Sequence, residues 1–350
     1  MFMILNLHSF HGYQYGGGVF QALDFFREST SICAVDCFVL ISGYFGIKWK
    51  FRSFFNLVFQ IFFWSIMVYL FAVGINAVNW QLKDFLTRFM CLKSSWGFVT
   101  SYIILYFAAP LLNSFSDAQK PRILLTYIVV LFLVINFVSM PSHSFFTYAL
   151  IYLIGRYLQK VGVANLKCKA GVAYLITTTI IFLLVYGLLY NTFHITDEEA
   201  VNKLPIGIIG YSYSSPLVIL QSVFLFLFFA QKTFYNRIVN WCATSCFAIF
   251  LIHMHPTIKD IGYYSYTAEL YNNSVINHII TLIVLMLSVF FGCIFLDKIR
   301  MAVSDSCLNM IYYIKKLLPV RWQQFENYIS NSFSQITSLS RGVCNDNKVN

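Results

Sequence analysis

Long apolar runs separated by short polar segments make up most of the chain. A helix that crosses the hydrocarbon of a bilayer needs about 20 mostly apolar residues, with about 17 as the usual minimum. Nine runs of about this length lie at 31–47, 53–75, 96–113, 123–140, 144–159, 171–190, 214–230, 239–256 and 275–296. An apolar piece from Met1 to His8 precedes them and is interpreted as the outer end of one further helix. The pattern predicts an all-α, polytopic transmembrane helix bundle of about ten helices, with the first truncated at the N-terminus.

The composition supports this interpretation and excludes several classes of protein. Hydrophobic residues make up 59% of the 350 residues and charged residues only 11%, against about 25% charged residues in a typical soluble domain. So few charges cannot cover the surface of a soluble protein of this length. A cytosolic globular enzyme, a disordered chain and a secreted disulfide scaffold are therefore excluded.

The nine cysteines show no metal-binding or redox motif, because no two of them form a Cys-x-x-Cys pair. Cys33 and Cys37 lie four residues apart inside an apolar run, as do Cys242 and Cys246, so each pair shares a helix face. A metal or redox pair at these positions remains an alternative, but small packing residues are favoured. We predict no bound metal.

The net charge of +10 reflects where the basic residues lie along the chain. Alternate segments between the runs, with the segment after the last run, hold eighteen of the 24 Lys and Arg residues, and the opposite segments hold six. Segments rich in Lys and Arg stay on the cytoplasmic side of a membrane. Both ends of the chain are thus predicted to be cytoplasmic, and the acidic Asp197–Glu199 segment is predicted to face outward.

This topology divides the chain into two parts and sets its expected surroundings. Residues 1–296 are predicted to form a membrane-embedded domain, and residues 297–350 a cytoplasmic C-terminal tail. The expected location is the cell inner (plasma) membrane, which the chain crosses many times, so the lipid bilayer is its first partner. Because the basic excess reports topology, no nucleic-acid partner is predicted.

Polar side chains inside the apolar runs are the candidate functional residues, since hydrocarbon makes each of them costly. Asp36 is the one carboxylate clearly within a predicted span, about 7–8 Å below its outer end at 1.5 Å per residue, and a helix-packing hydrogen bond is its alternative role. His8 and His253 lie at a comparable outer depth, and an outer loop of about twenty residues is expected between His8 and the span of Asp36. An imidazole suits proton transfer or hydrogen bonding, and His255 points to a different helix face from His253.

Several segments, taken in order, resemble the integral-membrane acyltransferase 3 family. They are MILNLH, VDCFVLISGYF followed by the basic KWKFR, WGFVTSYIILYFAAPLLNSF, YSSPLVILQSVFLFLFF and CFAIFLIHMHP. The resemblance extends from about residue 1 to residue 296, and His8 and His253 match two histidines of the family pattern. It implies an acyltransferase-like membrane domain that moves an acyl group, commonly acetyl from cytosolic acetyl-CoA, to sugars of surface polysaccharides.

The resemblance implies roles for the candidate residues in an O-acyltransferase, with acetylation as the expected reaction. His8 is expected to take the proton from the attacking sugar hydroxyl. Asp36 is expected to orient His8 or to position the acceptor, and His253 to donate to the developing oxyanion. The acceptor is expected to be a glycan of a cell-surface or exported polysaccharide.

Four basic residues on the predicted cytoplasmic side are candidates for binding the donor: Lys48, Lys50, Arg52 and Arg122. They are placed to attract the phosphates of acetyl-CoA or another acyl-CoA. Anchoring at the membrane surface explains any single one of them at least as well. Acyl-CoA is expected as a donor substrate, and no permanently bound cofactor is predicted.

Two other classes of function are alternatives to the acyltransferase. The first is a transporter or flippase for a polysaccharide intermediate, which would carry out no covalent chemistry and often contains internal repeats. The second is a membrane-bound sensor or assembly scaffold. Cleavage of an acyl-CoA thioester would separate the acyltransferase from both of them.

The first helix is expected to extend upstream of Met1. Eight apolar residues span about 12 Å of a hydrocarbon core of roughly 30 Å. The family pattern also places an arginine about ten residues before the histidine that His8 matches, and that position would precede Met1. We therefore expect about 15–20 further residues in the natural reading frame, since a full span needs that length.

Overall fold

The computed structural model of the chain describes residues 1–11, 18–89, 97–166, 168–192, 211–259 and 261–317, together with residue 324. Every regular element in these ranges is a helix, which confirms the predicted all-α class. The Asp197–Glu199 segment, predicted to face outward, lies outside the described residues.

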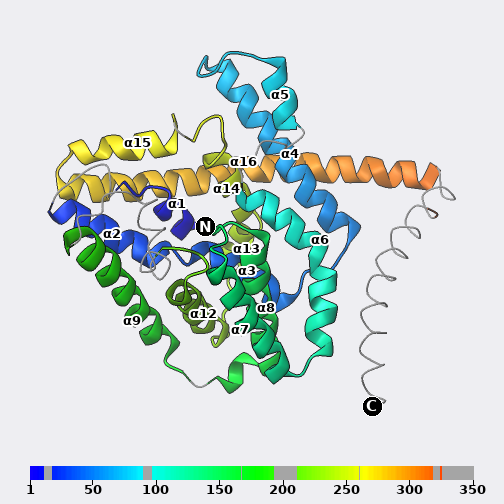
Figure 1. Cartoon of the computed structure of the whole chain (residues 1–350). Helices are drawn as coiled ribbons and strands as arrows, with labels where there is room; N and C mark the ends of the chain where they lie inside the picture. The colour runs from blue at the N-terminus through cyan, green and yellow to red at the C-terminus, as the bar shows by residue number, and fades with distance from the viewer. Residues whose placement is uncertain are drawn as a thin grey trace.

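The helices follow one another along the chain as Figure 1 shows. The first group comprises α1 (Phe2–Leu7), α2 (Val19–Ser31), α3 (Ala34–Phe45), α4 (Phe51–Gly74) and α5 (Leu82–Phe89). The middle group comprises α6 (Gly97–Ala118), α7 (Pro121–Phe137), α8 (Phe145–Val161), the 3-10 turn η1 (Val163–Asn165), α9 (Ala170–Phe182) and the π-helical segment η2 (Leu183–Thr192). The last group comprises α12 (Pro216–Ala230), α13 (Arg237–Ala243), α14 (Cys246–His253), α15 (Tyr263–Glu269), the 3-10 turn η3 (Leu270–Asn272) and α16 (Val275–Leu317).

Each of the predicted apolar runs coincides with one helix or with two consecutive ones, and α2, α5 and α15 occur in segments for which the apolar pattern predicts no helix. Helices long and apolar enough to cross a membrane are Arg52–Gly74, Gly97–Ala118, Ala170–Leu188 and Val275–Cys307, with shorter apolar helices at Pro121–Phe137 and Pro216–Ala230. The chain is therefore a membrane protein. The predicted number of ten spans is not confirmed.

Helix α2 replaces the outer loop expected between His8 and Asp36. Its buried residues are Gln21, Asp24, Phe25, Glu28, Ser29 and Ser31. Its exposed residues include Val19, Leu23 and Phe26. A helix of a soluble protein buries its apolar face and exposes its polar face, whereas α2 does the reverse. This arrangement is the one expected of a helix that faces hydrocarbon on one side and polar residues of the protein on the other.

Helix α3 begins three residues after the end of α2, so residues 19–45 form one nearly continuous helical segment. At 1.5 Å per residue this segment is about 40 Å long, enough to cross a hydrocarbon core of about 30 Å. Asp36 then lies about 25 Å from the start of α2. Helical structure therefore begins at Val19 rather than near residue 31, and the depth of Asp36 in the membrane stays a prediction.

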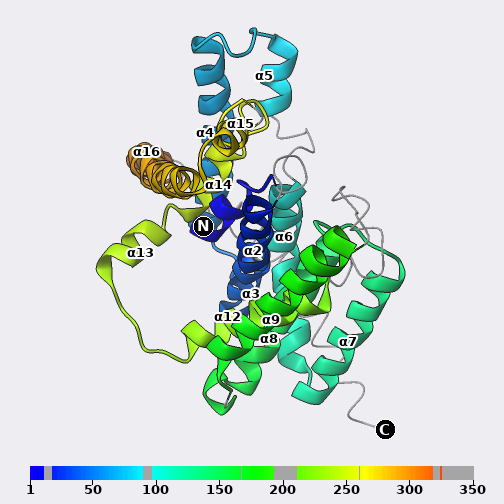
Figure 2. The ribbon, with the colours of Figure 1, turned by 90° about the vertical axis from the view of Figure 1, so that its left-hand side faces the viewer.

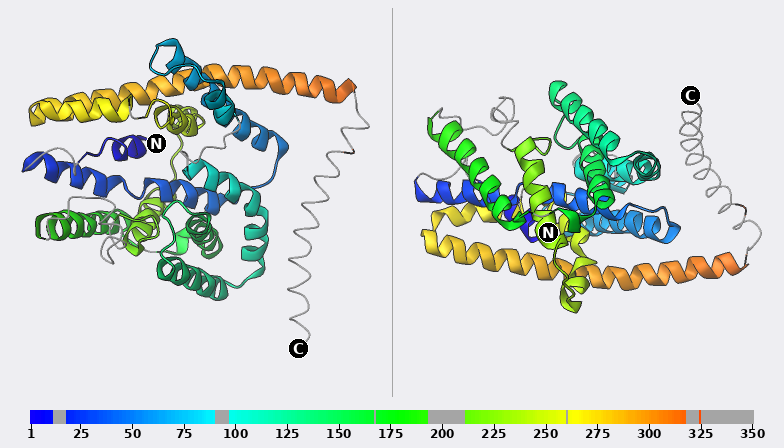
Figure 3. Two further views of the ribbon diagram at one scale, coloured as in Figure 1. Left: turned by 45° about the horizontal axis from the view of Figure 1, so that its top comes forward. Right: turned by 90° about the horizontal axis from the view of Figure 1, so that it is seen from below.

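The α2–α3 segment lies between α16 on one side and a group formed by α7, α8, α9 and α12 on the other (Figures 1 and 2). The short helix α1 lies between α2 and α16 (Figure 3). The predicted boundary between membrane domain and tail, at residue 296, falls inside α16, which continues without interruption to Leu317. Asp297 and Arg300 are buried on this helix.

Helices α3 and α8 cross in close contact because each carries a glycine at the crossing point. A Cβ atom on Gly155 would lie 2.5 Å from the carbonyl oxygen of Leu40, and one on Gly43 would collide with the backbone of Tyr152. Small residues allow helix backbones to approach in this way within membranes. The Tyr152 hydroxyl donates to Asn113 Oδ1 (2.7 Å) and so joins α8 to α6 near the same crossing.

Replacing Gly155 by alanine is expected to destabilise the fold strongly. The added methyl group meets backbone atoms rather than the end of a flexible side chain, so we expect a loss of about 3 kcal/mol or more, the upper part of the overpacking range. The measurement is the yield of monodisperse protein in detergent and its thermal unfolding midpoint. Gly292→Ala is the control, because a Cβ on Gly292 meets nothing within 4 Å. Equal stability of the two variants would contradict the tight α3–α8 crossing.

Candidate active site

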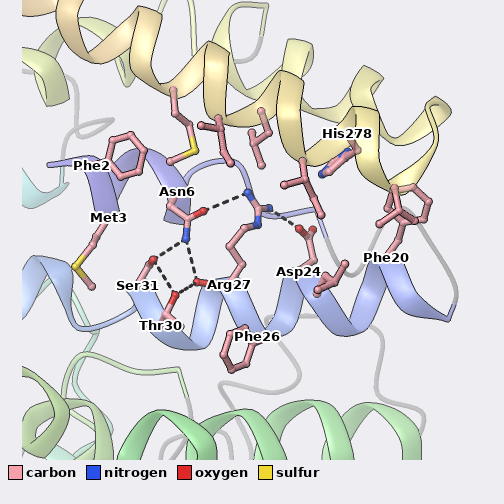
Figure 4. Close-up of a pocket in the computed structure, with 16 residues that line it drawn as sticks. Phe2, Met3, Asn6, Phe20, Asp24, Phe26, Arg27, Thr30, Ser31 and His278 are labelled. Carbon is pink, nitrogen blue, oxygen red and sulfur yellow. Dashed lines mark hydrogen bonds and ion pairs between the residues drawn. The ribbon is translucent and has the colours of Figure 1, made fainter. Parts of the chain in front are cut away.

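A hydrogen-bond network holds α1, and with it His8, against α2. Arg27 on α2 donates to Asn6 Oδ1 (3.3 Å) and Ser9 Oγ (2.7 Å), and its guanidinium also forms an ion pair with Asp24. Asn6 Nδ2 donates in return to the Arg27 carbonyl oxygen (3.0 Å; Figure 4). Asn6, Asp24 and Arg27 border a groove of about 430 Å³ between α2 and α16. Unpaired charges are costly inside a membrane, so Arg27 and Asp24 are expected to keep these partners. The network therefore fixes the position of α1.

His8 and His253 form a direct hydrogen bond that joins the end of α1 to the end of α14. His8 Nδ1 lies 2.8 Å from His253 Nε2, and His253 Nδ1 lies 2.5 Å from the carbonyl oxygen of Ile249. His253 is buried, and the ring of Phe250 lies 6.1 Å from that of His8. The two histidines that the sequence singled out at the outer ends of separate helices are thus brought together.

The geometry of this pair defines which nitrogen of His8 is basic. A carbonyl oxygen only accepts hydrogen bonds, so Nδ1 of His253 carries the hydrogen of that ring. With both rings neutral, Nε2 of His253 is then an acceptor, and Nδ1 of His8 donates to it. Nε2 of His8 is left with its lone pair, and it has no partner among the described residues. His8 is therefore held in the tautomer that a general base requires.

His8 lines two cavities on the predicted outer side. The outer chamber has a volume of about 690 Å³ and is bordered by Leu7, His8, Phe10, Glu28, Ile32, Ser142, His143, Tyr211, Tyr213, Met254, Lys259 and Tyr264. The inner pocket has a volume of about 130 Å³ and is bordered by Met1, Ile4, His8, Val35, Gly97, Phe98, His143, Tyr213, Phe250 and Met254. His8 and His143 thus border both cavities.

The chamber contains functional groups that sequence reasoning missed. Glu28 is buried on the polar face of α2, in a segment that reads as a loop by hydropathy. His143 lies in the loop between α7 and α8, and its Nδ1 is 2.9 Å from the hydroxyl oxygen of the buried Tyr148. Part of the His143 ring is exposed in the chamber, and the protein around the rest lowers its pKa by excluding water. No local motif marks either residue, so only the assembled chamber identifies them.

Asp36 is fully buried on α3 but does not join this group. Neither of its carboxylate oxygens accepts a hydrogen bond from any residue that the structure describes, and it borders neither cavity that contains His8. Asp36 was expected to orient His8 or to position the acceptor, and the residue that contacts the His8 ring is His253. His255 is likewise separate, since its Nε2 lies 3.1 Å from the carbonyl oxygen of Ser65.

A third cavity, the α4/α16 cavity, lies on the predicted cytoplasmic side. It has a volume of about 490 Å³ and is bordered by Phe38, Ser53, Asn56, Leu57, Gln60, Tyr102, Ala243, Thr244, Cys246, Phe247, Arg300, Met301, Ser304 and Asp305. Arg300 donates to both carboxylate oxygens of Asp297 (2.6 and 3.3 Å), which also accepts from Trp64 (3.1 Å). Arg300 thus presents a buried guanidinium to this cavity, and the apolar pattern of α16 gave no sign of it.

The four basic residues proposed from the sequence as donor-binding do not border this cavity. Lys48, Lys50, Arg52 and Arg122 are all exposed. Arg52 lies closest to it through an exposed ion pair of 3.4 Å with Asp305. Surface charges of this kind attract an anion from a distance. None of the four is in a buried position from which it would contact a donor in this cavity.

Five aromatic rings separate the α4/α16 cavity from the inner pocket. Phe38, Tyr102 and Phe247 border the first, and Phe98 and Phe250 border the second. The Phe98 and Tyr102 rings are stacked with centroids 5.8 Å apart, and the Phe98 and Phe250 centroids are 5.2 Å apart. This aromatic layer is the boundary between the cytoplasmic-side cavity and His8.

Comparisons with known proteins bear on the whole of this region. A family model for the acyltransferase domain of the acyltransferase 3 family matches residues 1–298. No curated protein and no solved structure gives a significant match. Among the described residues no group of three His, Cys, Asp or Glu side chains is arranged to hold a metal ion.

Proposed function

Since the chain belongs to the acyltransferase 3 family and is an acyltransferase, we propose that it transfers an acetyl group, or another acyl group, from cytosolic acyl-CoA to a sugar hydroxyl of a cell-surface or exported polysaccharide. The observation that carries this proposal is the hydrogen bond between His8 and His253. It leaves a basic imidazole nitrogen beside a polar chamber, as removal of a proton from a hydroxyl group requires.

The outer chamber has the properties of a sugar-binding site. Its volume of about 690 Å³ lies within the range of small-molecule sites, and Tyr211, Tyr213 and Tyr264 border it. Carboxylate, imidazole and hydroxyl groups supply hydrogen bonds to sugar hydroxyls, and Glu28 and Lys259 add a charge of each sign. The chamber lies on the predicted outer side, opposite the segments rich in Lys and Arg, and an exported glycan would be found there.

The donor is proposed to approach from the other side. Arg300 offers a planar guanidinium, which suits the oxygens of a diphosphate, and the exposed Lys48, Lys50, Arg52 and Arg122 attract the nucleotide from the cytosol. The pantetheine arm would then cross the aromatic layer by displacing its side chains, since the rings of Phe38 and Phe98 are in edge-to-face contact with centroids 5.7 Å apart. His8 lies beyond that layer, beside the acceptor.

The reaction is an acyl transfer that balances without a further reactant. The sugar oxygen forms a bond to the thioester carbonyl carbon while its proton passes to Nε2 of His8. Collapse of the tetrahedral intermediate breaks the carbon–sulfur bond. The departing sulfur takes the proton from His8 and leaves as the free thiol, and the sugar carries the ester.

The test uses the full-length protein in lipid vesicles. The substrates are acyl-CoA labelled in its acyl group and the surface polysaccharide of the cells that carry the gene. We expect labelled ester on the glycan and one equivalent of free thiol. Surface polysaccharide from cells with and without the gene is compared by NMR for ester-linked acyl groups. A transporter or scaffold would release no thiol, and unchanged ester content in all surface glycans would contradict the proposal.

Arg300→Lys is expected to weaken donor binding. Lysine keeps the charge beside Asp297 and so avoids an unpaired buried carboxylate, but it cannot form the paired hydrogen bonds of a guanidinium. We expect the KM for acyl-CoA to rise about tenfold, corresponding to the loss of one charge-assisted hydrogen bond, with little change in kcat. Lys120→Gln, at an exposed position outside the α4/α16 cavity, is the control. An unchanged KM for acyl-CoA in Arg300→Lys would remove Arg300 from the donor site.

A further inference from the structure

His143 faces the same two cavities as His8 but comes from a different part of the fold. It belongs to the loop between α7 and α8, and its carbonyl oxygen accepts a hydrogen bond from Ser101 Oγ on α6 (2.6 Å). Its ring packs edge-on against Tyr213, with centroids 5.0 Å apart. His143 is thus held by its backbone and by its ring, as a group that acts at a fixed point in a reaction must be.

The hydrogen bond to Tyr148 determines which nitrogen of His143 carries hydrogen. Tyr148 is fully buried, and its hydroxyl makes one hydrogen bond within the described residues, to His143 Nδ1 at 2.9 Å. A buried hydroxyl hydrogen needs an acceptor, so Tyr148 donates and Nδ1 of His143 accepts. The hydrogen of the neutral His143 ring then resides on Nε2. That nitrogen has no partner in the described part of the chain and remains to donate to a ligand.

We propose that His143 donates a hydrogen bond to the oxyanion of the acyl-transfer step and that Tyr148 is the positioning residue that holds it in the donating tautomer, an inference that rests on the proposed acyl transfer. His8 then presents a lone pair to the two shared cavities, and His143 presents an N–H group to them. Acyl transfer to a hydroxyl needs both, one to take the proton and one to stabilise the charge on the carbonyl oxygen.

The geometry favours His143 over His253 for this role. Both ring nitrogens of His253 are engaged, Nδ1 with the Ile249 carbonyl and Nε2 with His8, so it has no hydrogen left for an oxyanion. The lowered pKa of His143 agrees with a neutral ring, and a neutral imidazole can serve as the hydrogen-bond donor to a developing oxyanion. The oxyanion role expected of His253 is thus given to His143, and His253 orients His8 instead.

The test compares His143→Leu, His143→Gln and Tyr148→Phe with the wild-type protein in lipid vesicles, at saturating donor and acceptor. Loss of one oxyanion donor lowers kcat by about 10²–10³. We expect that fall in His143→Leu, with the KM values for both substrates changed by less than about threefold, because oxyanion contacts form in the transition state. Glutamine retains an N–H donor and should restore part of kcat. Tyr148→Phe should lower kcat about tenfold, since Nδ1 then loses the hydrogen bond that selects the tautomer.

Ser144→Ala is the matched control, because Ser144 follows His143 in the same loop, contacts Thr147 (2.9 Å) rather than the His143 ring, and borders neither cavity around His8. At equal amounts of folded protein it should change kcat by less than about threefold, since a lost N-cap lowers the stability of a helix rather than a reaction rate. A kcat for His143→Leu within tenfold of wild type, or a loss confined to KM, would overturn the role of His143 while transfer by the wild-type protein still supported the proposed function. Absence of transfer by the wild-type protein would overturn both.

Discussion

His8→Ala is expected to abolish acyl transfer while leaving the folded protein in place. General-base catalysis contributes about 10²–10⁴ to a rate, and Nε2 of His8 is the basic nitrogen that the His8–His253 pair directs to both outer cavities. His8 ends α1 through its backbone N–H, which alanine keeps, and α1 is held in place through Asn6, Ser9 and Leu5. The measurement is the ester content of the acceptor glycan, divided by the amount of protein in the membrane.

The matched control for His8→Ala is His255→Ala. His255 is also a buried histidine near the end of α14, but it contacts the carbonyl oxygen of Ser65 and borders neither cavity that contains His8. The rate per folded molecule should therefore change much less. Near-normal acylation by His8→Ala would remove His8 from the mechanism, and the family membership would then be the remaining support for an enzymatic role.

Replacing His253 by leucine is expected to lower the transfer rate by about 10² or more, although His253 does not act on the substrate. Without an acceptor at that point, the hydrogen of His8 is free to occupy either nitrogen, and the ring is free to rotate. Loss of the group that fixes the tautomer of a catalytic histidine costs up to about 10⁴ in a serine protease. Here the acceptor is a neutral imidazole rather than a carboxylate, so we expect the smaller effect.

His253→Gln separates the hydrogen bond from simple packing. The glutamine carbonyl oxygen accepts a hydrogen bond from Nδ1 of His8, so this variant should recover a substantial part of the activity that His253→Leu loses. Both variants are compared at equal amounts of folded protein, with kcat and the KM for the glycan measured separately. Equal activity of the two variants would show that His253 acts through packing and not through the tautomer of His8.

The sequence by itself determined the class of the protein and the positions of most of its helices. Runs of apolar residues as long as those of α4, α6 and α16 have no stable arrangement in water, and a helix satisfies its own backbone in hydrocarbon. The same local reasoning fails at α2, whose Gln21, Asp24 and Glu28 read as a polar loop. Burial of those residues depends on elements such as α1 and α9 that pack against α2, and no local window of sequence contains them.

The site was determined by the sequence only in part. His8 and His253 stand out because an imidazole in an apolar run is costly and therefore noticeable. Asp36 stands out for the same reason, yet the fold brings it to neither cavity around His8. The free-energy cost of a polar side chain in hydrocarbon marks that residue as unusual, but it does not indicate which residues the side chain contacts.

Tertiary structure alone decided which groups act together. His8 and His253 are 245 positions apart, and their hydrogen bond exists because α1 lies between α2 and α16 and ends beside α14. His143 lies in a loop, and Arg300 lies on α16 just beyond the apolar run that ends at residue 296, so neither is conspicuous in the sequence. Their significance comes from the cavities that surround them, and a cavity is a property of packed helices rather than of any one segment.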